Sequence, residues 1–158
     1  DCTAAITFNL LPSLTTAGNS CFASNTSATT YDLPSLATAG VQCFFGNTSV
    51  TTFNLLPSLT SAGYECFKNC ALGTTFDLPA LTTAGDYCFN FCYAATLINI
   101  PLCTALGTTV GDNGVFNDIT GNTITINVPA SLATANGGSP DGDLVYLAAN
   151  NTETIVYI

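Results

Sequence analysis

A repeat of about 22 residues fills most of this chain and limits what it can fold into. Prolines recur at spacings of 22, 23, 22 and 22 residues, and a glycine follows each proline after six residues. These prolines are Pro12, Pro34, Pro57, Pro79 and Pro101. A repeat this short cannot bury an apolar face alone, so neighbouring repeats must stack on one another. The period therefore predicts an elongated stack with a continuous core.

The residues before each proline alternate between polar and apolar types, which is the period of a half-buried strand. Thr30-Tyr31-Asp32-Leu33 and Thr75-Phe76-Asp77-Leu78 are two examples. Each repeat is expected to supply one short strand, stacked in parallel on its neighbours about 4.8 Å away. Proline then ends the strand because it has no N–H to donate to the sheet.

A second motif, Cys-Phe-x-x-Asn/Cys, follows the glycine of each repeat, as in Cys43 to Asn47 and Cys66 to Cys70. This spacing predicts a single helical turn that places the first and last residues on one side. The last residue is expected to be buried, and an Asn side chain there can bond the backbone of its own turn.

The combined pattern resembles the short leucine-rich repeats of bacterial surface antigens, the BspA-like family. Cysteine stands in that family's alanine position, at Cys21, Cys43, Cys66 and Cys88. The resemblance covers roughly residues 1 to 107 and implies a mainly β fold, a leucine-rich-repeat-like solenoid of 22–23-residue coils with short helical turns. A thinner core is expected where the family usually has Ile, at Ala17, Ala39, Ala62 and Ala84.

The period fails from Thr108 to Asn122, where Gly, Asn and Asp indicate turns. Residues 123–129 then restore a strand and its proline, a helix is expected at 144–149, and residues 154–158 form a last strand. The open end of a solenoid needs an atypical closing segment of this kind. We therefore assign residues 1–107 to the solenoid and residues 108–158 to a C-terminal cap. The amino-acid sequence of this cap resembles the C-terminal ends of repeat proteins from some bacteria and their phages.

Charge and composition exclude several partners. With one Lys, no Arg and a net charge of -9, the chain offers little to release counterions from nucleic acid, so no nucleic-acid partner is expected. No apolar run approaches the roughly 18 residues needed to span a bilayer, so no membrane span is expected.

Catalysis has little support in the sequence. The chain has no His and no Arg, which leaves a serine or cysteine nucleophile without its usual base. Asp32 and Asp77 share one strand position at an expected distance of roughly 10 Å, near the upper limit for an inverting glycosidase pair. A solvated polar face explains the two carboxylates equally well. We therefore expect no enzyme activity and no cofactor.

The eight cysteines allow three interpretations. Buried thiols are favoured because the cysteines occupy repeat columns and free Cys packs as a small hydrophobe. Disulfides between stacked coils are the second interpretation, since the spacing between cysteines of one column is within the distance that a disulfide can bridge. A metal site of Cys66, Cys70, Cys88 and Cys92 is the third. Asp141-Gly142-Asp143 suggests Ca²⁺ less strongly than it suggests the start of a helix. No metal site is expected.

The candidate binding residues lie on the polar face of the strands. They are Asn9, Asp32, Asn54, Asp77, Asn99 and Asn127. Such a flat Thr/Asn/Asp face suits sugars, another protein or ice, and it is equally explained as the wet side of a sheet. The leading hypothesis is a structural or adhesive module, non-catalytic, displayed on a virion or on a cell surface in the extracellular space. The alternative is a carbohydrate- or receptor-binding module that uses this face. The expected partner is a protein or glycan on a surface, and a homo-oligomer stays open.

Overall fold

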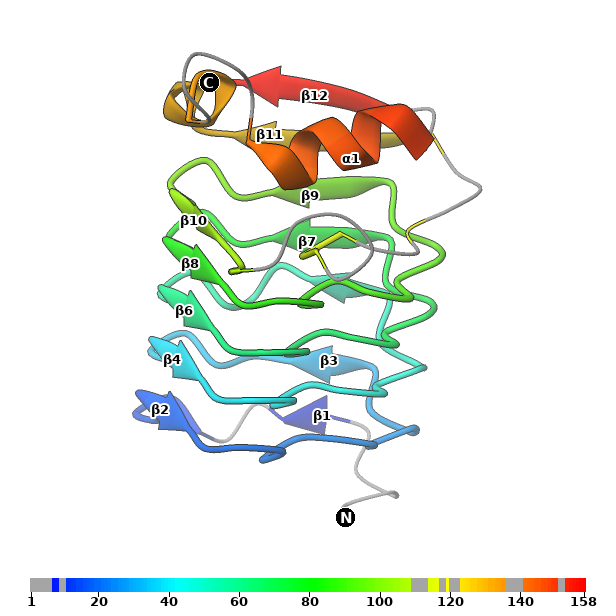
Figure 1. The fold of residues 1–158 in the computed structure, drawn as a ribbon. Coiled ribbons are helices and arrows are strands. Elements are labelled where there is room, and N and C mark those ends of the chain that lie inside the picture. Colours follow the sequence, from blue (N-terminus) through cyan, green and yellow to red (C-terminus); the bar gives the residue numbers. More distant parts are fainter. Residues whose placement is uncertain are drawn as a thin grey trace.

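The structure is a computed structural model that describes residues 7–8, 11–108, 114–116, 119, 123–135, 141–150 and 153–158. It consists mainly of parallel β-sheets with one short α-helix. The repeats follow one another as layers of a stack, with the helix and the last strands at the C-terminal end (Figure 1).

The strands expected before the prolines are present and pair in parallel. Four of them, β5, β7, β9 and β11, form one sheet with the last strand in the order β12-β11-β9-β7-β5, and β1 pairs with β3 in a two-stranded sheet. Their bounds are β1 Thr7–Phe8, β3 Thr30–Tyr31, β5 Thr52–Phe53, β7 Thr75–Asp77, β9 Leu97–Asn99, β11 Ile124–Val128 and β12 Glu153–Tyr157. The register places Phe53 beside Phe76, Phe76 beside Ile98 and Ile98 beside Ile126, so inward-facing residues of equivalent position stack on one another.

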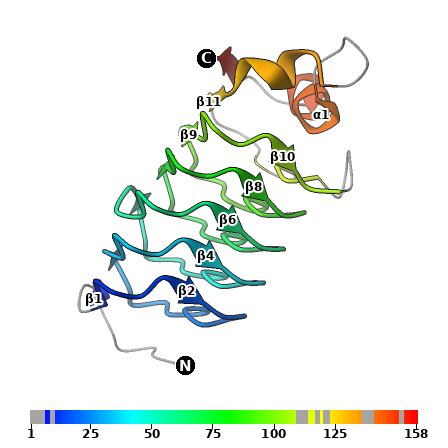
Figure 2. The same cartoon turned by 90° about the vertical axis from the view of Figure 1, so that its left-hand side faces the viewer.

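A second parallel sheet shows that the expectation of one strand per repeat is wrong. It has the order β10-β8-β6-β4-β2 and rises along the stack as a row of short arrows (Figure 2). Its strands are β2 Thr16–Ala17, β4 Thr38–Ala39, β6 Ser61–Ala62, β8 Thr83–Ala84 and β10 Ala105–Leu106. Each strand is two residues long, so no alternation in the sequence reveals it. Only pairing with the same segment of the next repeat makes it a strand.

The expected single helical turn after each glycine is also wrong. The segment forms consecutive turns, in which the Ala23 N–H donates to the Ser20 carbonyl at 3.2 Å, and Ser20 has a left-handed φ of 54°. This conformation directs alternate N–H groups to the next repeat. Ser20 donates to Val41 at 2.8 Å and Phe22 donates to Cys43 at 2.9 Å. A helical turn would aim these donors along its own axis, so stacking favours the turns instead.

The buried side chains form a single core cluster that extends from Ala17 to Leu147. Two aromatic columns run through it. Phe44 stacks on Phe67 with ring centroids 5.3 Å apart, and Phe53 stacks on Phe76 at 5.2 Å. Between the columns, Phe44 meets Phe53 edge to face at 5.8 Å. Both arrangements are favourable for aromatic rings, so equivalent ring contacts stabilise the successive repeats that carry them.

The C-terminal segment has the expected strand, helix and strand. Helix α1 spans Gly142–Asn150, and the strands are β11 and β12, which pair in parallel over five residues. A 3₁₀-helix, η1, at Ala130–Ala133 was not expected from the sequence. The Asp141 Oδ1 atom accepts the Asp143 N–H at 3.0 Å, and Asp143 Oδ2 accepts the Val115 N–H at 3.2 Å. Both acids therefore serve backbone donors near the helix start. Within the described ranges, no helix is long and apolar enough to cross a membrane.

Candidate functional site

Three of the expected binding residues form one hydrogen-bonded column on the outer face of the strands. Asp77, Asn99 and Asn127 are register partners on β7, β9 and β11, and all three are half-buried. Asn127 Nδ2 donates to Asn99 Oδ1 at 3.0 Å, and Asn99 Nδ2 donates to Asp77 Oδ1 at 2.7 Å. The structure therefore brings these side chains together, as the repeat alignment predicts.

The other expected residues do not continue this column. Asn9 lies outside the described residues, and Asp32 is half-buried on the other side of a break in the sheet. Asn54 is exposed, and β5 pairs with β7 only through Thr52 and Phe53. The repeat of Asn54 has one additional residue before its proline, Leu55, which is 39% exposed. This insertion ends the strand early, and the 23-residue proline spacing was its signal in the sequence.

The Asp77-Asn99-Asn127 column can offer hydrogen bonds to hydroxyl groups. Each Asn amide has two N–H donors and an oxygen acceptor, and the Asp carboxylate has two acceptor oxygens. The two bonds within the column use only part of this capacity. They also hold the three side chains in fixed orientations.

The cysteines are mostly buried, as expected. Six of the seven described cysteines are buried, and all seven have free thiols. Burial raises the pKa of the Cys103 thiol to about 11 and that of Cys43 to about 12, so these thiols stay neutral near pH 7. A neutral thiol is a poor nucleophile and a poor metal ligand. Cys21 is the exception to the expected burial, because it is exposed at the first position of its column.

The Asn/Cys column has a structural role. Asn47 Nδ2 donates to the Phe44 carbonyl of its own turn at 2.7 Å, as expected, and also to Phe22 of the preceding repeat at 2.9 Å. Cys70 Sγ keeps the second of these bonds, to the Phe44 carbonyl, at 3.2 Å. Both residue types therefore join adjacent repeats. The described part of the chain holds no group of three or more residues suited to a metal ion.

A cluster that sequence reasoning missed lies on the turns of the third and fourth repeats. Lys68 Nζ lies 5.0 Å from the centre of the Tyr87 ring and 5.6 Å from that of Phe91. Tyr64 meets the Tyr87 ring at 5.6 Å, and Tyr93 meets the Phe91 ring at 5.7 Å. We call this surface the turn face, made of Tyr64, Glu65, Lys68, Tyr87, Phe91 and Tyr93. Its one sequence signal is that Lys68 is the only Lys or Arg in the chain.

Glu65 neutralises the lysine of the turn face. Lys68 Nζ lies 2.5 Å from Glu65 Oε1, and Gln42 Nε2 donates to Glu65 Oε2 at 2.6 Å. Burial alone raises the pKa of Glu65, but the hydrogen bonds from Lys68 and Gln42 outweigh it and hold that pKa below its ordinary value. The carboxylate is therefore charged near pH 7 and cancels the ammonium charge.

Parallel stacking of short repeats places the chain among the repeat proteins. The family model of the BspA-type leucine-rich repeat region, in six copies, matches residues 1–96, which is more than half of the 158 residues. The chain belongs to this family. Repeat modules of this type are typically surface- or adhesion-related and generally non-catalytic, and leucine-rich repeat proteins generally bind other proteins. No curated protein and no solved structure is similar enough to match the chain.

Proposed function

We propose that this chain is a non-catalytic structural or adhesive module, displayed on a cell surface or a virion, that works by holding surface residues rigidly in place. In this proposal residues 1–107 form a leucine-rich-repeat-like solenoid of 22–23-residue coils, and residues 108–158 cap its C-terminal end. Membership of a family that is typically surface-related supports the location.

One observation carries the proposal more than any other. Repeats are joined by backbone hydrogen bonds at three places, namely the strands before the prolines, the strands of the second sheet and the turns between these strands. In the turns, for example, the Phe44 N–H donates to Cys66 and the Phe67 N–H donates to Cys88, both at 2.9 Å. Threonine side chains add further bonds, such as Thr74 Oγ1 to the Thr51 carbonyl at 3.0 Å. A stack fixed in this way suits presentation of a surface at constant spacing.

A second candidate function is carbohydrate or receptor binding through the polar strand face. The Asp77-Asn99-Asn127 column favours it, because side chains that already hold one another lose little conformational entropy when a ligand binds. The ligand would be a hydroxyl-rich sugar or a polar protein surface.

Surface display can be tested with an antibody raised against the purified chain. Labelling of intact cells or virions is the expected result. Labelling that appears only after permeabilisation would contradict display.

Adhesion and strand-face binding can be separated with two variants of the purified chain. The first combines Asp77→Ala with Asn99→Ala, and the matched control is Thr38→Ala, at an exposed position of the second sheet. Each is applied to a glycan array and to isolated envelopes. If the strand face binds sugars, the first variant alone loses its signal. If adhesion uses another face, both variants retain envelope binding. Absence of any binding above background would contradict adhesion and favour a purely structural role.

A further inference from the structure

Four turn positions differ in every repeat, although their neighbours are constant. The Cys-Phe pair is identical in the four repeats that contain Cys21, Cys43, Cys66 and Cys88. The variable columns are Asn19/Val41/Tyr64/Asp86, Ser20/Gln42/Glu65/Tyr87, Ala23/Phe45/Lys68/Asn90 and Ser24/Gly46/Asn69/Phe91. Stacking requires the constant residues, because they face the core and the adjacent repeat. The residue type at the variable positions changes while the backbone bonds of the turns persist, so stacking does not require any one side chain there.

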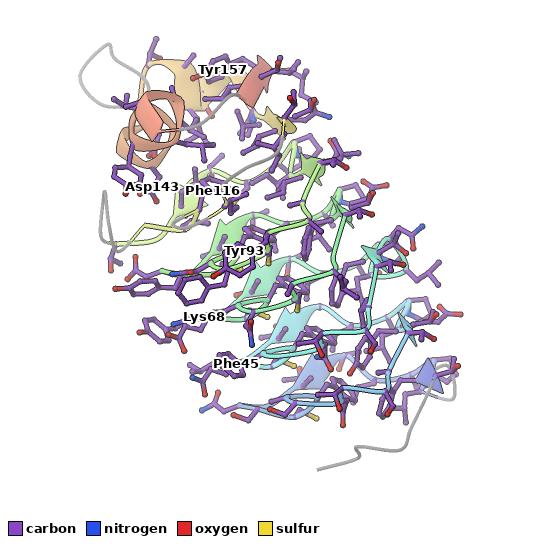
Figure 3. The ribbon with its side chains drawn as sticks, turned by 90° about the vertical axis from the view of Figure 1, so that its right-hand side faces the viewer. Phe45, Lys68, Tyr93, Phe116, Asp143 and Tyr157 are labelled. Carbon is purple, nitrogen blue, oxygen red and sulfur yellow. The ribbon has the colours of Figure 1, made fainter. Side chains whose placement is uncertain are left out.

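The variable positions gather on one side of the stack. Phe45 and Lys68, which share one variable column, lie at successive levels of that side, and Tyr93, whose ring contacts that of Phe91, lies at the level after them (Figure 3). The strand face, by contrast, repeats almost the same residues in each layer. Per-repeat variation on a constant scaffold is how repeat proteins commonly build a binding face.

Two aromatic residues hold an unfavourable backbone conformation on this side. Tyr87 has a φ of 57° and Phe91 a φ of 59°. The position of Phe91 is taken by Gly46 in the second repeat, which has a φ of 68° and no side chain to strain. The stack imposes this conformation in every repeat, but a large aromatic side chain costs more free energy in it than Gly, Ser or Asn, which points to a role for these two rings beyond stacking. Neither ring belongs to the buried core, so core packing does not explain them.

The turn face already binds one cation, its own lysine. The Lys68 ammonium group lies near the Tyr87 and Phe91 rings and contacts the Glu65 carboxylate. The rings of Tyr64 and Tyr93 continue this cluster outward, and these residues are 42% and 47% exposed. Aromatic faces attract cations, and exposed tyrosines are frequent at the centres of protein interfaces.

We propose that the turn face binds an arginine- or lysine-bearing segment of a partner protein. Charge complementarity decides the partner, because the chain has a net charge of -9 and its single lysine is neutralised by Glu65. A cation is therefore attracted by the whole molecule, whereas an acidic partner is repelled. Arginine fits better than lysine because its planar guanidinium group stacks on aromatic rings. This inference rests on the proposed interaction role and names the chemistry of the partner.

The test uses the full chain and a fluorescein-labelled peptide of alternating glycine, serine and arginine. The same peptide with citrulline in place of arginine keeps the shape and loses the charge. Fluorescence anisotropy at low and high salt gives the affinities. We expect the arginine peptide to bind, the citrulline peptide to bind far more weakly, and Tyr64→Ala and Phe91→Gly each to weaken binding about two- to fivefold. Phe91→Gly copies Gly46 and relieves strain, so its Tm should stay equal or rise while its affinity falls.

A third variant tests the internal cation. Lys68→Met removes the lysine that occupies the rings, so the arginine peptide should bind more tightly. Asn54→Asp is the matched control, because it changes net charge equally on the strand face, where Asn54 is exposed. Equal tightening by Asn54→Asp and Lys68→Met would show a general charge effect and overturn the proposal. Arginine-peptide binding that is unchanged in Tyr64→Ala and Phe91→Gly would also overturn the proposal. A glycan-array signal that these two variants abolish, while the arginine peptide does not bind, would overturn it as well. A full chain that does not bind the arginine peptide would contradict this inference but not surface display, because antibody labelling tests display separately.

Discussion

At the residue scale, buried polar side chains are matched to their aromatic neighbours. The Tyr31 hydroxyl donates to Asn47 Oδ1 at 2.8 Å and accepts from Asn25 Nδ2 at 3.2 Å. Burial raises the pKa of Tyr31, so its hydroxyl stays protonated and able to donate. Two repeats later the same aromatic position is Phe76, and the column residues at the corresponding places are Cys70 and Cys92. Tyrosine therefore occupies this aromatic position where both neighbouring residues of the Asn/Cys column are Asn.

Tyr31→Phe is expected to lower the free energy of unfolding by about 1–3 kcal/mol, because it removes the buried hydroxyl that donates to Asn47 Oδ1 and accepts from Asn25 Nδ2. Urea unfolding followed by circular dichroism measures the change. A double variant with Asn47→Cys copies the Phe76/Cys92 combination and should lose less than the sum of the single variants. Strictly additive losses would show that the residues are not coupled.

Glycine at the end of the second strand permits close contact between repeats. A Cβ atom at Gly85 would lie 2.6 Å from the Tyr64 nitrogen and 2.7 Å from the Gly63 carbonyl carbon, which are backbone atoms of the preceding repeat. At Gly18 a Cβ atom would meet nothing within 4 Å. The same glycine column is therefore essential for stacking in one repeat and free in another.

We expect Gly85→Ala to lower the free energy of unfolding by about 1–3 kcal/mol through overpacking. Gly18→Ala should be neutral or stabilise by about 0.4–1 kcal/mol, since it restricts the unfolded chain without a clash. Thermal unfolding of both variants gives the comparison. An equal loss in the two would mean that the glycines serve the backbone conformation and not the contact between repeats.

At the element scale, β12 and α1 cover the C-terminal end of the stack. Ile155 of β12 packs against the core, and Leu144 and Leu147 of α1 are buried in it. Asp143 ties the helix start to Val115, as described above. β12 itself remains an edge strand of its sheet. We therefore expect that β12 contributes by covering the apolar layer, as the proposed cap requires.

Deletion of residues 150–158 should uncover that layer and leave the β11 edge open. We expect a lower Tm and concentration-dependent aggregation or filament growth, because an open parallel edge beside apolar surface can pair with another chain. Light scattering and thermal unfolding of the shortened and full chains measure both effects. A shortened chain that stays monomeric and equally heat-stable would assign β12 to an interface with a partner subunit.

At the scale of the whole molecule, the buried thiols make stability depend on alkaline pH. A thiol in the unfolded chain ionises near pH 8.5, about its ordinary pKa. In the folded chain burial raises the pKa of Cys103 to about 11 and of Cys43 to about 12. The unfolded state therefore releases protons first as pH rises, and unfolding becomes more favourable. The stabilisation is fully present below about pH 8 and is lost towards the folded pKa values.

Each buried thiol should lower the free energy of unfolding by up to about 1.4 kcal/mol per pH unit in that range. Urea unfolding near neutral pH and at about pH 10, with a reducing agent present, tests this. Cys70→Asn copies Asn47 of the same column, removes one thiol and should give a shallower dependence. Stability that does not change with alkaline pH would contradict burial of the thiols.

The sequence by itself determined which residues are equivalent. A nearly constant period identifies the strands before each proline and the buried Asn/Cys column, and the structure confirms both among the residues it describes. The turns expected from Thr108 to Asn122 lie largely outside the described residues. The period also placed Asp77, Asn99 and Asn127 in one column, because residues at the same position of stacked repeats must be neighbours. The family match agrees with the resemblance carried by the same motif.

Only the tertiary structure decided how the chain runs between those positions. The two-residue strands such as Thr38–Ala39, the left-handed turns and the break at Asn54 all depend on hydrogen bonds to the adjacent repeat. The contact of Lys68 with the Tyr87 and Phe91 rings likewise joins residues from different repeats. Such contacts arise only when repeats stack, whereas local residue patterns describe one repeat at a time. For that reason the spacing predicted the layers, and stacking determined the turn face.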